Sequence, residues 1–266
     1  MPKAYYNEND SFAADWLRSL IRAGLIMDGE VDDRDIREVE ASDLDGFTRC
    51  HFFAGIAGWD YALQLAGWPD DRPVWTGSCP CQPFSSAGKG KGTADERHLW
   101  PEFARLIREC KPATVFGEQV ASKAGREWFD GVSADLEDMG YAAAAADLCA
   151  AGVNAPHIRQ RLFWVADQEP DEYLCRSGMV DTFRERRRQR TSGEWDAGNA
   201  AGPGQDVWGG EYGRCADGKS RRVPPGVPLL ANGIQSRVGR LRGYGNAIVP
   251  QVGAEFIGAY LDAVSA

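Results

Sequence analysis

Hydrophobic and polar residues alternate along this chain in the pattern of strands separated by helices. Apolar side chains recur at helical spacing after residue 11, which predicts a helix over Ser11–Ala23. The apolar stretch Phe47–Ala54 predicts a buried strand, and it runs through the turn GIAG into the amphipathic stretch WDYALQLAGW. Strand, glycine turn and helix is an order that brings backbone amides close to a cofactor, although a tight packing connection has the same pattern.

The same pattern continues through most of the second half of the chain. It predicts helices over Glu102–Cys110, before Gly140 and after Pro250, and strands over Ala113–Val120 and Leu162–Ala166. In the acidic segment before Gly46, Val31 and Ile36 indicate at most a short strand. This alternation predicts an α/β fold, a doubly wound sheet with ligand chemistry at its strand ends. Periodicity is lost after Asp167, which indicates a small irregular lobe.

Composition narrows the class of protein. The 266 residues are 43% hydrophobic, enough for a full core, and no apolar run reaches the roughly 18 residues of a membrane span. We therefore expect a soluble, cytoplasmic protein without a membrane partner. Seven scattered cysteines, an odd number, predict free thiols rather than a disulfide framework.

The net charge of −9 is unevenly distributed. Residues 1–156 hold 15 Lys and Arg against 26 Asp and Glu, whereas residues 157–266 hold 15 against 13. The second half, with its basic runs RERRRQR at 184–190 and KSRR at 219–222, is therefore the better candidate for phosphate contacts. A solvated arginine-rich helix face is the alternative reading of these runs.

The stretch GSCPCQPFSSAG, at 77–88, is typical of a stiff loop that presents a thiol. A thiol attacks only as the thiolate, which makes Cys81 a candidate nucleophile. Cys79 and Cys81 could equally be small buried hydrophobes or half of a zinc site. No second close Cys or His pair completes a zinc site, so we expect no metal, and the C-x-C spacing disfavours a thiol redox protein.

Five separated stretches together resemble the motifs of the DNA (cytosine-5)-methyltransferase family, in the family's order. They are FAGIAG at 53–58, PCQPFS at 80–85, GEQV at 117–120, HIRQR at 157–161 and GNAIV at 245–249. PCQPFS is the most specific of them. Three positions depart from the family pattern: Gln119 replaces an Asn, His157 a Gln, and His51 stands where an acid is usual.

The spacing of the motifs also departs from the family. Only 26 residues separate Gly55 from Cys81, too few for the two strand–helix units that normally lie between these motifs. The stretch YNENDSFA at 6–13 is similar to the family's Asn-Glu-x-Asp segment, and Arg34-Asp35-Ile36 to its Asp-Ile segment. We therefore hypothesise a permutation in which the second and third strands of the sheet precede the first. The alternative is that residues 1–46 form an unrelated acidic cap.

The resemblance implies a Rossmann-like methyltransferase that uses S-adenosylmethionine to methylate a flipped cytosine in DNA, as a monomer. Residues 1–166 and 231–266 would form the catalytic domain, and 167–230 a small target-recognition lobe. The implied catalytic residues are Cys81 as nucleophile, Glu118 and Arg161 as partners of the base, and Arg159 as a brace. The implied cofactor-binding residues are Glu8, Asp35, Ile36, Phe53, Ala54, Gly55, Ile56, Gly58 and Asn246. The implied DNA-binding residues are Gln82, Ser85, Arg184, Arg186, Arg187 and Arg188.

Two other functions fit the same residues. A modified sulfonium donor would give a C5-substituted cytosine other than 5-methylcytosine. A non-catalytic DNA-binding relative is also conceivable, and the intact Cys81, Glu118 and arginine motif argue against it. No residue pattern indicates the target sequence.

Overall fold

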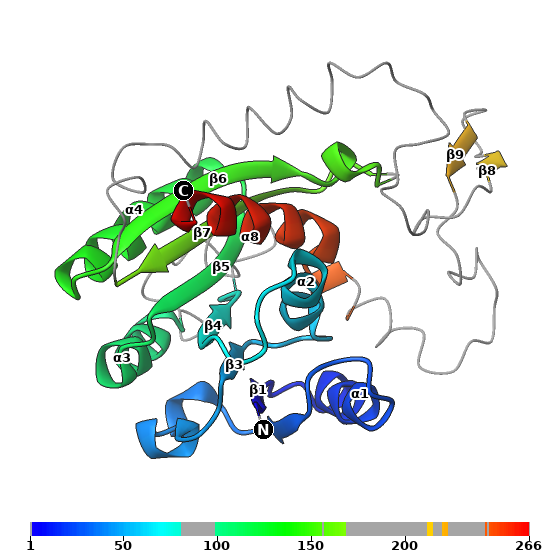
Figure 1. Cartoon of the computed structure of the whole chain (residues 1–266). Coiled ribbons are helices and arrows are strands. Elements are labelled where there is room, and N and C mark those ends of the chain that lie inside the picture. Colours follow the sequence, from blue (N-terminus) through cyan, green and yellow to red (C-terminus); the bar gives the residue numbers. More distant parts are fainter. Residues whose placement is uncertain are drawn as a thin grey trace.

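Seven strands form one mixed sheet at the centre of the molecule, in the order β2-β1-β3-β4-β5-β7-β6 (Figure 1). The computed structural model describes residues 2–80, 99–155, 157–168, 243 and 245–265, and the backbone of 212–214 and 220–222. β2 to β5 pair in parallel, whereas β7 runs antiparallel to β5 and β6. The strands are β1 Ala4–Asn7, β2 Gly29–Asp32, β3 Arg49–Phe52, β4 Val74–Gly77, β5 Thr114–Val120, β6 Ala142–Cys149 and β7 Gln160–Asp167. β8 Tyr212–Arg214 and β9 Ser220–Arg222 form a separate antiparallel pair.

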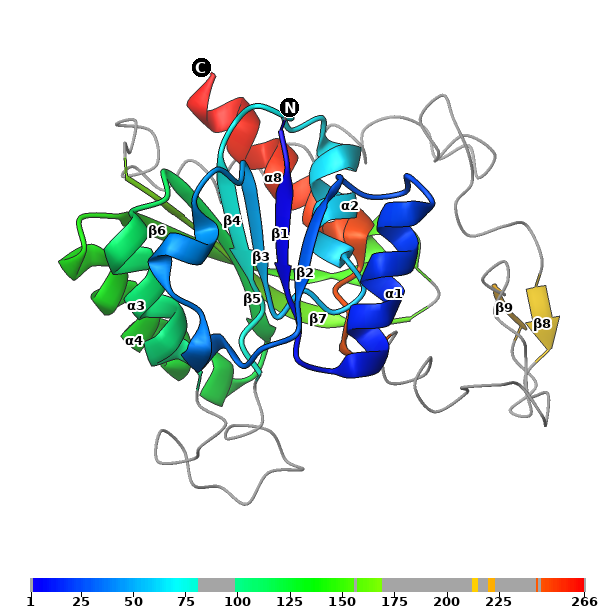
Figure 2. The ribbon, with the colours of Figure 1, turned by 90° about the horizontal axis from the view of Figure 1, so that it is seen from below.

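Helices cover both faces of the sheet (Figure 2). α3 Trp100–Cys110 and α4 Lys123–Asp138 lie on one face, together with the 3-10 turns η1 Ile36–Glu38 and η2 Ala41–Leu44. α1 Ser11–Arg22, α2 Gly58–Ala66 and α8 Pro250–Val264 lie on the other, and the short turn η5 Ala150–Val153 follows β6. Each face has its own core, with Phe103 and Trp164 in one and Phe116 and Phe256 in the other. This is the predicted doubly wound α/β arrangement.

Helix α1 illustrates how the sequence sets the local structure. Asp10 lies just before it, and its carboxylate accepts hydrogen bonds at 3.1 Å from the backbone nitrogens of Phe12 and Ala13, which otherwise lack partners in a first turn. The helix buries Leu17 against the sheet and ends at Arg22, before Gly24 turns left-handed with φ of 65°. The prediction of a helix over Ser11–Ala23 is thus confirmed to within one residue.

β1 and β2 precede β3 in the sequence, yet both lie beyond β3 in the sheet. β1 pairs with both β3 and β2, with Asn7 opposite Phe52 on one side and opposite Asp32 on the other. The Asn7 amide also donates to the carbonyl of Arg34 at 2.9 Å, which ties the ends of β1 and β2 together. This is the strand arrangement that the permutation hypothesis predicts. Ile36 itself begins η1, so the short strand indicated near it lies earlier, at β2.

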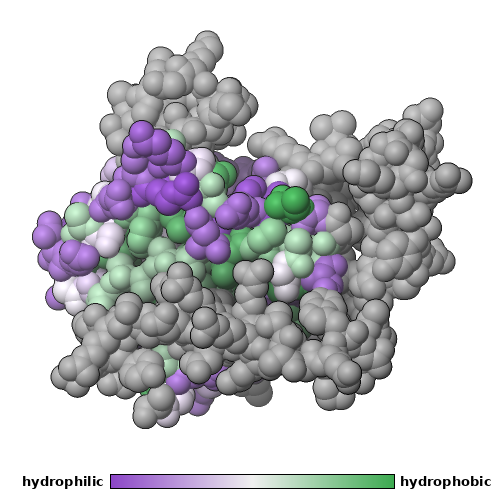
Figure 3. Space-filling view, turned by 90° about the horizontal axis from the view of Figure 1, so that it is seen from above, coloured by the Kyte–Doolittle hydropathy of each residue, from purple (hydrophilic) through white to green (hydrophobic). Residues whose placement is uncertain are grey.

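The outer strand β6 is unusual in composition. Five of its eight residues are consecutive alanines, and they are partly exposed. Seen from above the view of Figure 1, the described surface carries a pale hydrophobic band beside strongly hydrophilic side chains (Figure 3). Elsewhere in the described ranges, no helix combines the length and the apolar character that a bilayer crossing requires.

Candidate active site

The carboxyl ends of five parallel strands meet at one edge of the sheet. The ladders pair Asn7 with Phe52, Phe52 with Gly77, and Gly77 with Gly117. The next residues of these four strands therefore fall in one row, which consists of Glu8, Phe53, Ser78 and, still within β5, Glu118. Polar groups that follow buried strands in this way are the usual place for ligand chemistry in an open α/β sheet.

The turn after β3 is held by a side chain from β1. Phe53, Gly55 and Ala57 all have positive φ, at 52°, 57° and 63°, so the backbone is tightly wound here. The nitrogen of Gly55 donates to Oε2 of Glu8 at 2.7 Å, and the nitrogen of Asp10 donates to its Oε1 at 2.9 Å. The structure thus brings together two segments that were both predicted to bind the cofactor.

The other predicted cofactor-binding residues differ in their exposure. Phe53 and Ile56 are half-buried, Ala54 is buried, and Asn246 is exposed. A Cβ on Gly58 would lie 2.9 Å from Ile248 Cγ1, so the glycine lets the closing motif pack against α2. Asp35 caps η1 by accepting from the nitrogen of Arg37, and Ile36 is only 2% exposed within the core below η1.

A buried ionic cluster lies behind the turn. Arg49 and Asp60 are both fully buried, and Arg49 Nη1 lies 3.0 Å from Asp60 Oδ1. His51 lies 3.4 Å from the same carboxylate oxygen, and its Nδ1 is 2.8 Å from Thr76 Oγ1. Burial acts to raise the pKa of Asp60, but contacts with His51, the Met27 nitrogen and Arg49 outweigh it and hold this pKa well below its usual range. Position 51 of β3, where the sequence motif usually has an acid, holds a histidine in this chain. The acid beside it is Asp60, which comes from α2.

Glu118 and Arg161 form an ion pair at the carboxyl end of β5. Glu118 is 8% exposed, and Arg161 Nε lies 2.7 Å from its Oε1. Burial raises the pKa of Glu118, while Arg161, Arg159 and a hydrogen bond from Ser78 act in the opposite direction. Burial is the largest of these effects, so the pKa of Glu118 is raised overall, which favours the protonated form that can donate a hydrogen bond to a ligand.

Arg159 connects the arginine motif to the closing motif of the chain. Its Nη2 donates to the carbonyls of Gly245 and Ala247, both at 2.8 Å. The resemblance implied that Arg159 braces a loop or a phosphate, and here it braces the loop 245–247. The motifs HIRQR and GNAIV, more than eighty residues apart in sequence, are thus in direct contact.

The segment that leads to Cys81 is anchored on the same edge. The amide of Gln119 donates to the carbonyl of Cys79 at 3.5 Å, and the Trp59 indole donates to Ser78 Oγ at 3.0 Å. Burial raises the pKa of the Cys79 thiol, which suits an inert neighbour rather than a nucleophile. The described chain breaks off after Pro80, so the predicted residues Cys81, Gln82, Ser85, Arg184, Arg186, Arg187 and Arg188 lie outside the described residues.

Sequence reasoning missed two contacts of this site. Neither Ser78 nor Trp59 was singled out, although both belong to the layer around Glu118. The one signal was the position of Ser78, directly after a short apolar run and inside the cysteine loop. Among the described residues no group of three or more His, Cys, Asp or Glu side chains gathers as metal ligands do, and a metal-free site stays a prediction.

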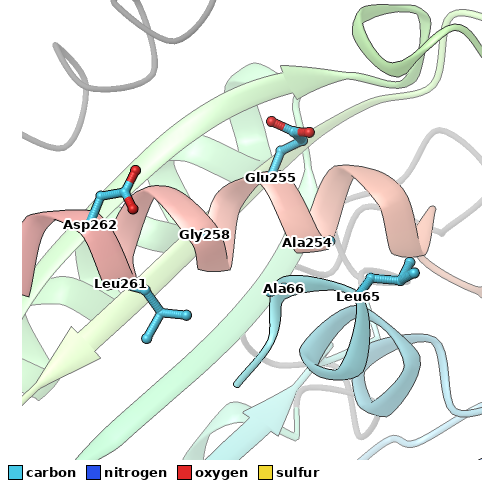
Figure 4. A pocket seen from close by; sticks show the side chains of 7 residues that line it. All are labelled: Leu65, Ala66, Ala254, Glu255, Gly258, Leu261 and Asp262. Atoms are coloured by element: carbon cyan, nitrogen blue, oxygen red, sulfur yellow. The ribbon is translucent and has the colours of Figure 1, made fainter. Parts of the chain in front are cut away.

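A hollow of about 230 Å³ lies elsewhere, between α2 and α8 (Figure 4). It is lined by Leu65, Ala66, Ala254, Glu255, Gly258, Leu261 and Asp262. None of the predicted site residues contributes to it, so it is separate from the strand ends described above.

The chain is similar to known DNA methyltransferases. A profile of the family described as C-5 cytosine-specific DNA methylase matches residues 67–195. The type II methyltransferase M.AluI of Cellulosimicrobium cellulans is 32% identical over 157 residues, which are 54% of this chain and 28% of that enzyme. M.HhaI of Haemophilus parahaemolyticus is 32% identical over 99 residues, which are 36% of this chain and 30% of that enzyme. The matched segments thus span less than a third of either enzyme. The crystal structure of S. pombe Dnmt2 methyltransferase aligns with 78% of this chain and 62% of its own, at 16% identity and a TM-score of 0.41.

The strand order and the side chains that line up at the strand ends define a Rossmann-like α/β domain. The sequence matches refine this class. Over residues 67–195 the chain is similar to the C-5 cytosine-specific DNA methylase family.

Proposed function

We propose that this protein transfers a methyl group from S-adenosylmethionine to C5 of cytosine in DNA. The observation that carries the proposal is the ion pair between the buried Glu118 and the partly exposed Arg161, which lies beside the segment that leads to Cys81. A buried carboxyl group with an arginine partner can donate one hydrogen bond to a pyrimidine ring nitrogen while the arginine holds the neighbouring oxygen. We further propose that the protein acts as a cytoplasmic monomer.

The residues at the turn after β3 fit the proposed donor. Both oxygens of Glu8 accept backbone hydrogen bonds, and an ionised carboxylate is also the kind of acceptor that binds ribose hydroxyls. Phe53, Ala54, Gly55, Ile56 and Gly58 would border the donor along the wound turn, with Asn246 beside it. Asp35 and Ile36 would border the adenine, with Ile36 contributing chiefly through its backbone because its side chain is buried. When bound, S-adenosylmethionine supplies an electrophilic methyl group on a sulfonium.

The proposed chemistry at the base follows from the weakness of cytosine C5 as a nucleophile. The Cys81 thiolate adds to C6, which breaks the C5–C6 double bond and turns the ring into an enamine with a nucleophilic C5. Glu118 in its protonated form donates to N3, and Arg161 holds O2, so the charge that develops on the ring is neutralised. After C5 has gained the methyl group, a base removes its proton, the double bond re-forms and the thiolate leaves.

C5 and C6 of cytosine are inaccessible to the enzyme inside a duplex, so the proposal requires the cytosine to be flipped out of the helix. Gln82 and Ser85 would contact the extruded nucleotide from the cysteine loop. The arginines Arg184, Arg186, Arg187 and Arg188 would contact phosphates, which are read without regard to sequence. Arg159 would keep the closing motif in place beside the flipped base, through its two carbonyl contacts.

The test is methyl transfer from tritiated S-adenosylmethionine to duplex DNA by the purified chain. We expect Cys81→Ala to abolish transfer while DNA binding persists, and Cys79→Ala, its matched control, to retain transfer. Undiminished transfer by Cys81→Ala would overturn the covalent mechanism. Mass spectrometry of nucleosides from the treated DNA identifies the group added to C5, and any product other than 5-methylcytosine would replace the proposed donor by a modified sulfonium.

A further inference from the structure

Ser78 has no role in the chemistry proposed above, yet its side chain joins two buried groups. β4 and β5 pair in parallel with Gly77 opposite Gly117, so the next residues along, Ser78 and Glu118, lie side by side. The Ser78 hydroxyl is therefore placed next to the Glu118 carboxyl group, and as a hydrogen-bond donor it lowers the pKa of that group. The Trp59 indole nitrogen lies 3.0 Å from the same hydroxyl oxygen.

The direction of these hydrogen bonds is fixed by the chemistry of the groups. An indole N–H can only donate, so the Ser78 oxygen accepts from Trp59. The single hydroxyl proton of Ser78 is then available to Glu118, which as a carboxylate can only accept. The order of donation is therefore Trp59 to Ser78 to Glu118.

The first donor of this series is held rigidly. Trp59 is 4% exposed on α2, and its ring stacks on Phe116 at 6.1 Å and meets Phe163 edge-on at 5.7 Å. These contacts pack the indole ring on two sides, which favours the orientation in which its N–H donates to Ser78. The orientation of the serine hydroxyl is thus set by the packing of the core.

We propose that Ser78 and Trp59 are positioning residues, which together hold the Glu118 carboxyl group in one orientation for its contact with the base. This inference rests on the proposed function, because that function gives Glu118 its task. Within the described residues the charged groups facing Glu118 are Arg161, bound to Oε1, and Arg159. Ser78 adds a second, neutral donor that also favours the ionised carboxylate, and so limits how strongly burial favours the protonated acid.

The test is a direct titration of Glu118 by NMR, in protein carrying 13C-labelled glutamate carboxyl groups. Glu118→Gln assigns the signal, and the titration needs no enzymatic activity. In Ser78→Ala we expect the midpoint to move to higher pH by about one pH unit, the size of one hydrogen bond to a charged group. Ser78→Thr keeps the hydroxyl and should restore the wild-type midpoint. An unchanged midpoint in Ser78→Ala would overturn the inference.

Trp59→Phe provides a second variant that keeps an aromatic ring and removes only the N–H. We expect its midpoint to move in the same direction by a smaller amount, and no movement would remove Trp59 from the proposal. In methyl transfer assays, the high-pH limb of kcat/KM should move with the midpoint, whereas a purely structural role would lower the rate equally at every pH. Should the wild type transfer no methyl group, the proposed function fails, and the NMR titration still decides whether Ser78 orients Glu118.

Discussion

The Glu8 carboxylate accepts a 2.7 Å hydrogen bond from the backbone nitrogen of Gly55, 47 residues further along the chain. Its other oxygen accepts from the nitrogen of Asp10, so one side chain fixes both the end of β1 and the turn after β3. The two segments therefore behave as one structural unit. A substitution at Glu8 therefore also affects the turn around Gly55, although the two are far apart in the sequence.

Glu8→Gln should weaken the binding of S-adenosylmethionine by at least roughly tenfold, because a neutral amide accepts less strongly from both the turn and a ribose hydroxyl. Isothermal titration calorimetry of the purified chain measures this affinity. Glu30→Gln, at an exposed position of β2, is the matched control and should bind like the wild type. Unchanged affinity in Glu8→Gln would count against the permuted cofactor site.

Asp60→Asn should destabilise the fold by about 3 kcal/mol, because it removes the buried charged partner of Arg49 and leaves that guanidinium with only the exposed carboxylate of Asp70. Urea unfolding at neutral pH measures the change. Asp130→Asn, an exposed substitution in α4, should change the free energy of unfolding by less than about 0.5 kcal/mol. A similarly small change in Asp60→Asn would show that the buried pair contributes little.

The stability difference between the wild type and Asp60→Asn should depend on pH. The pKa of Asp60 is held well below its usual range in the folded protein, so its contribution is complete above the unfolded pKa of about 4 and is lost as the pH falls toward the folded value. The difference in unfolding free energy should therefore be constant from pH 7 to about 5 and should shrink below about 4. Parallel urea titrations at several pH values test this, and a difference that grows on acidification would contradict it.

Gly55→Ala should destabilise the protein by about 1 to 2 kcal/mol through backbone strain alone. Its φ is 57°, and nothing lies within 4 Å of an added Cβ, so no clash contributes. Gly131→Ala is the matched control, because a Cβ at Gly131 would also meet open space. Gly131 lies in the middle of α4, where alanine is more favourable than glycine by up to about 1 kcal/mol. Urea unfolding should give changes of opposite sign for the two variants, and changes of the same sign would refute the strain argument.

Arg159→Ala should release the closing motif from the site. The substitution removes two hydrogen bonds to the carbonyls of Gly245 and Ala247, and we expect hydrogen exchange of nearby amides such as Ala247 to accelerate by roughly tenfold or more. Mass spectrometry of peptides from this segment measures the exchange. Arg126→Ala, which removes an exposed ion pair with Asp147, should leave the segment unchanged.

The elements that the sequence predicted well are those with a long, clear period. α1, α3 and β5 have enough residues for a repeat of apolar positions to stand out, and they form close to the predicted bounds. β4 has only four residues, too few to show an alternation. β6 contains five consecutive alanines, a residue that is depleted in strands, and it is a strand because it pairs along its whole length with β7.

The candidate site was predictable to the extent that its residues belong to recognisable motifs. Glu118, Arg159 and Arg161 were identified in this way, and the structure places Glu118 beside Arg161. The buried pair of Arg49 and Asp60 was not predicted, because an aspartate in a short amphipathic helix looks solvent-exposed until its three-dimensional neighbours are known. Contacts between side chains of different strands and helices depend on how these elements pack together. The local sequence pattern does not contain that information.

The order of the strands also decides the order in which the proposed cofactor site is made. A ribosome synthesises β1 and β2 before β3, so Glu8 is complete some seconds before the turn that it holds. During that interval one edge of β1 has no partner strand, because β1 lies between β2 and β3 in the sheet and β3 has not yet been made. This end of the sheet therefore closes only when residues 49–52 have been synthesised.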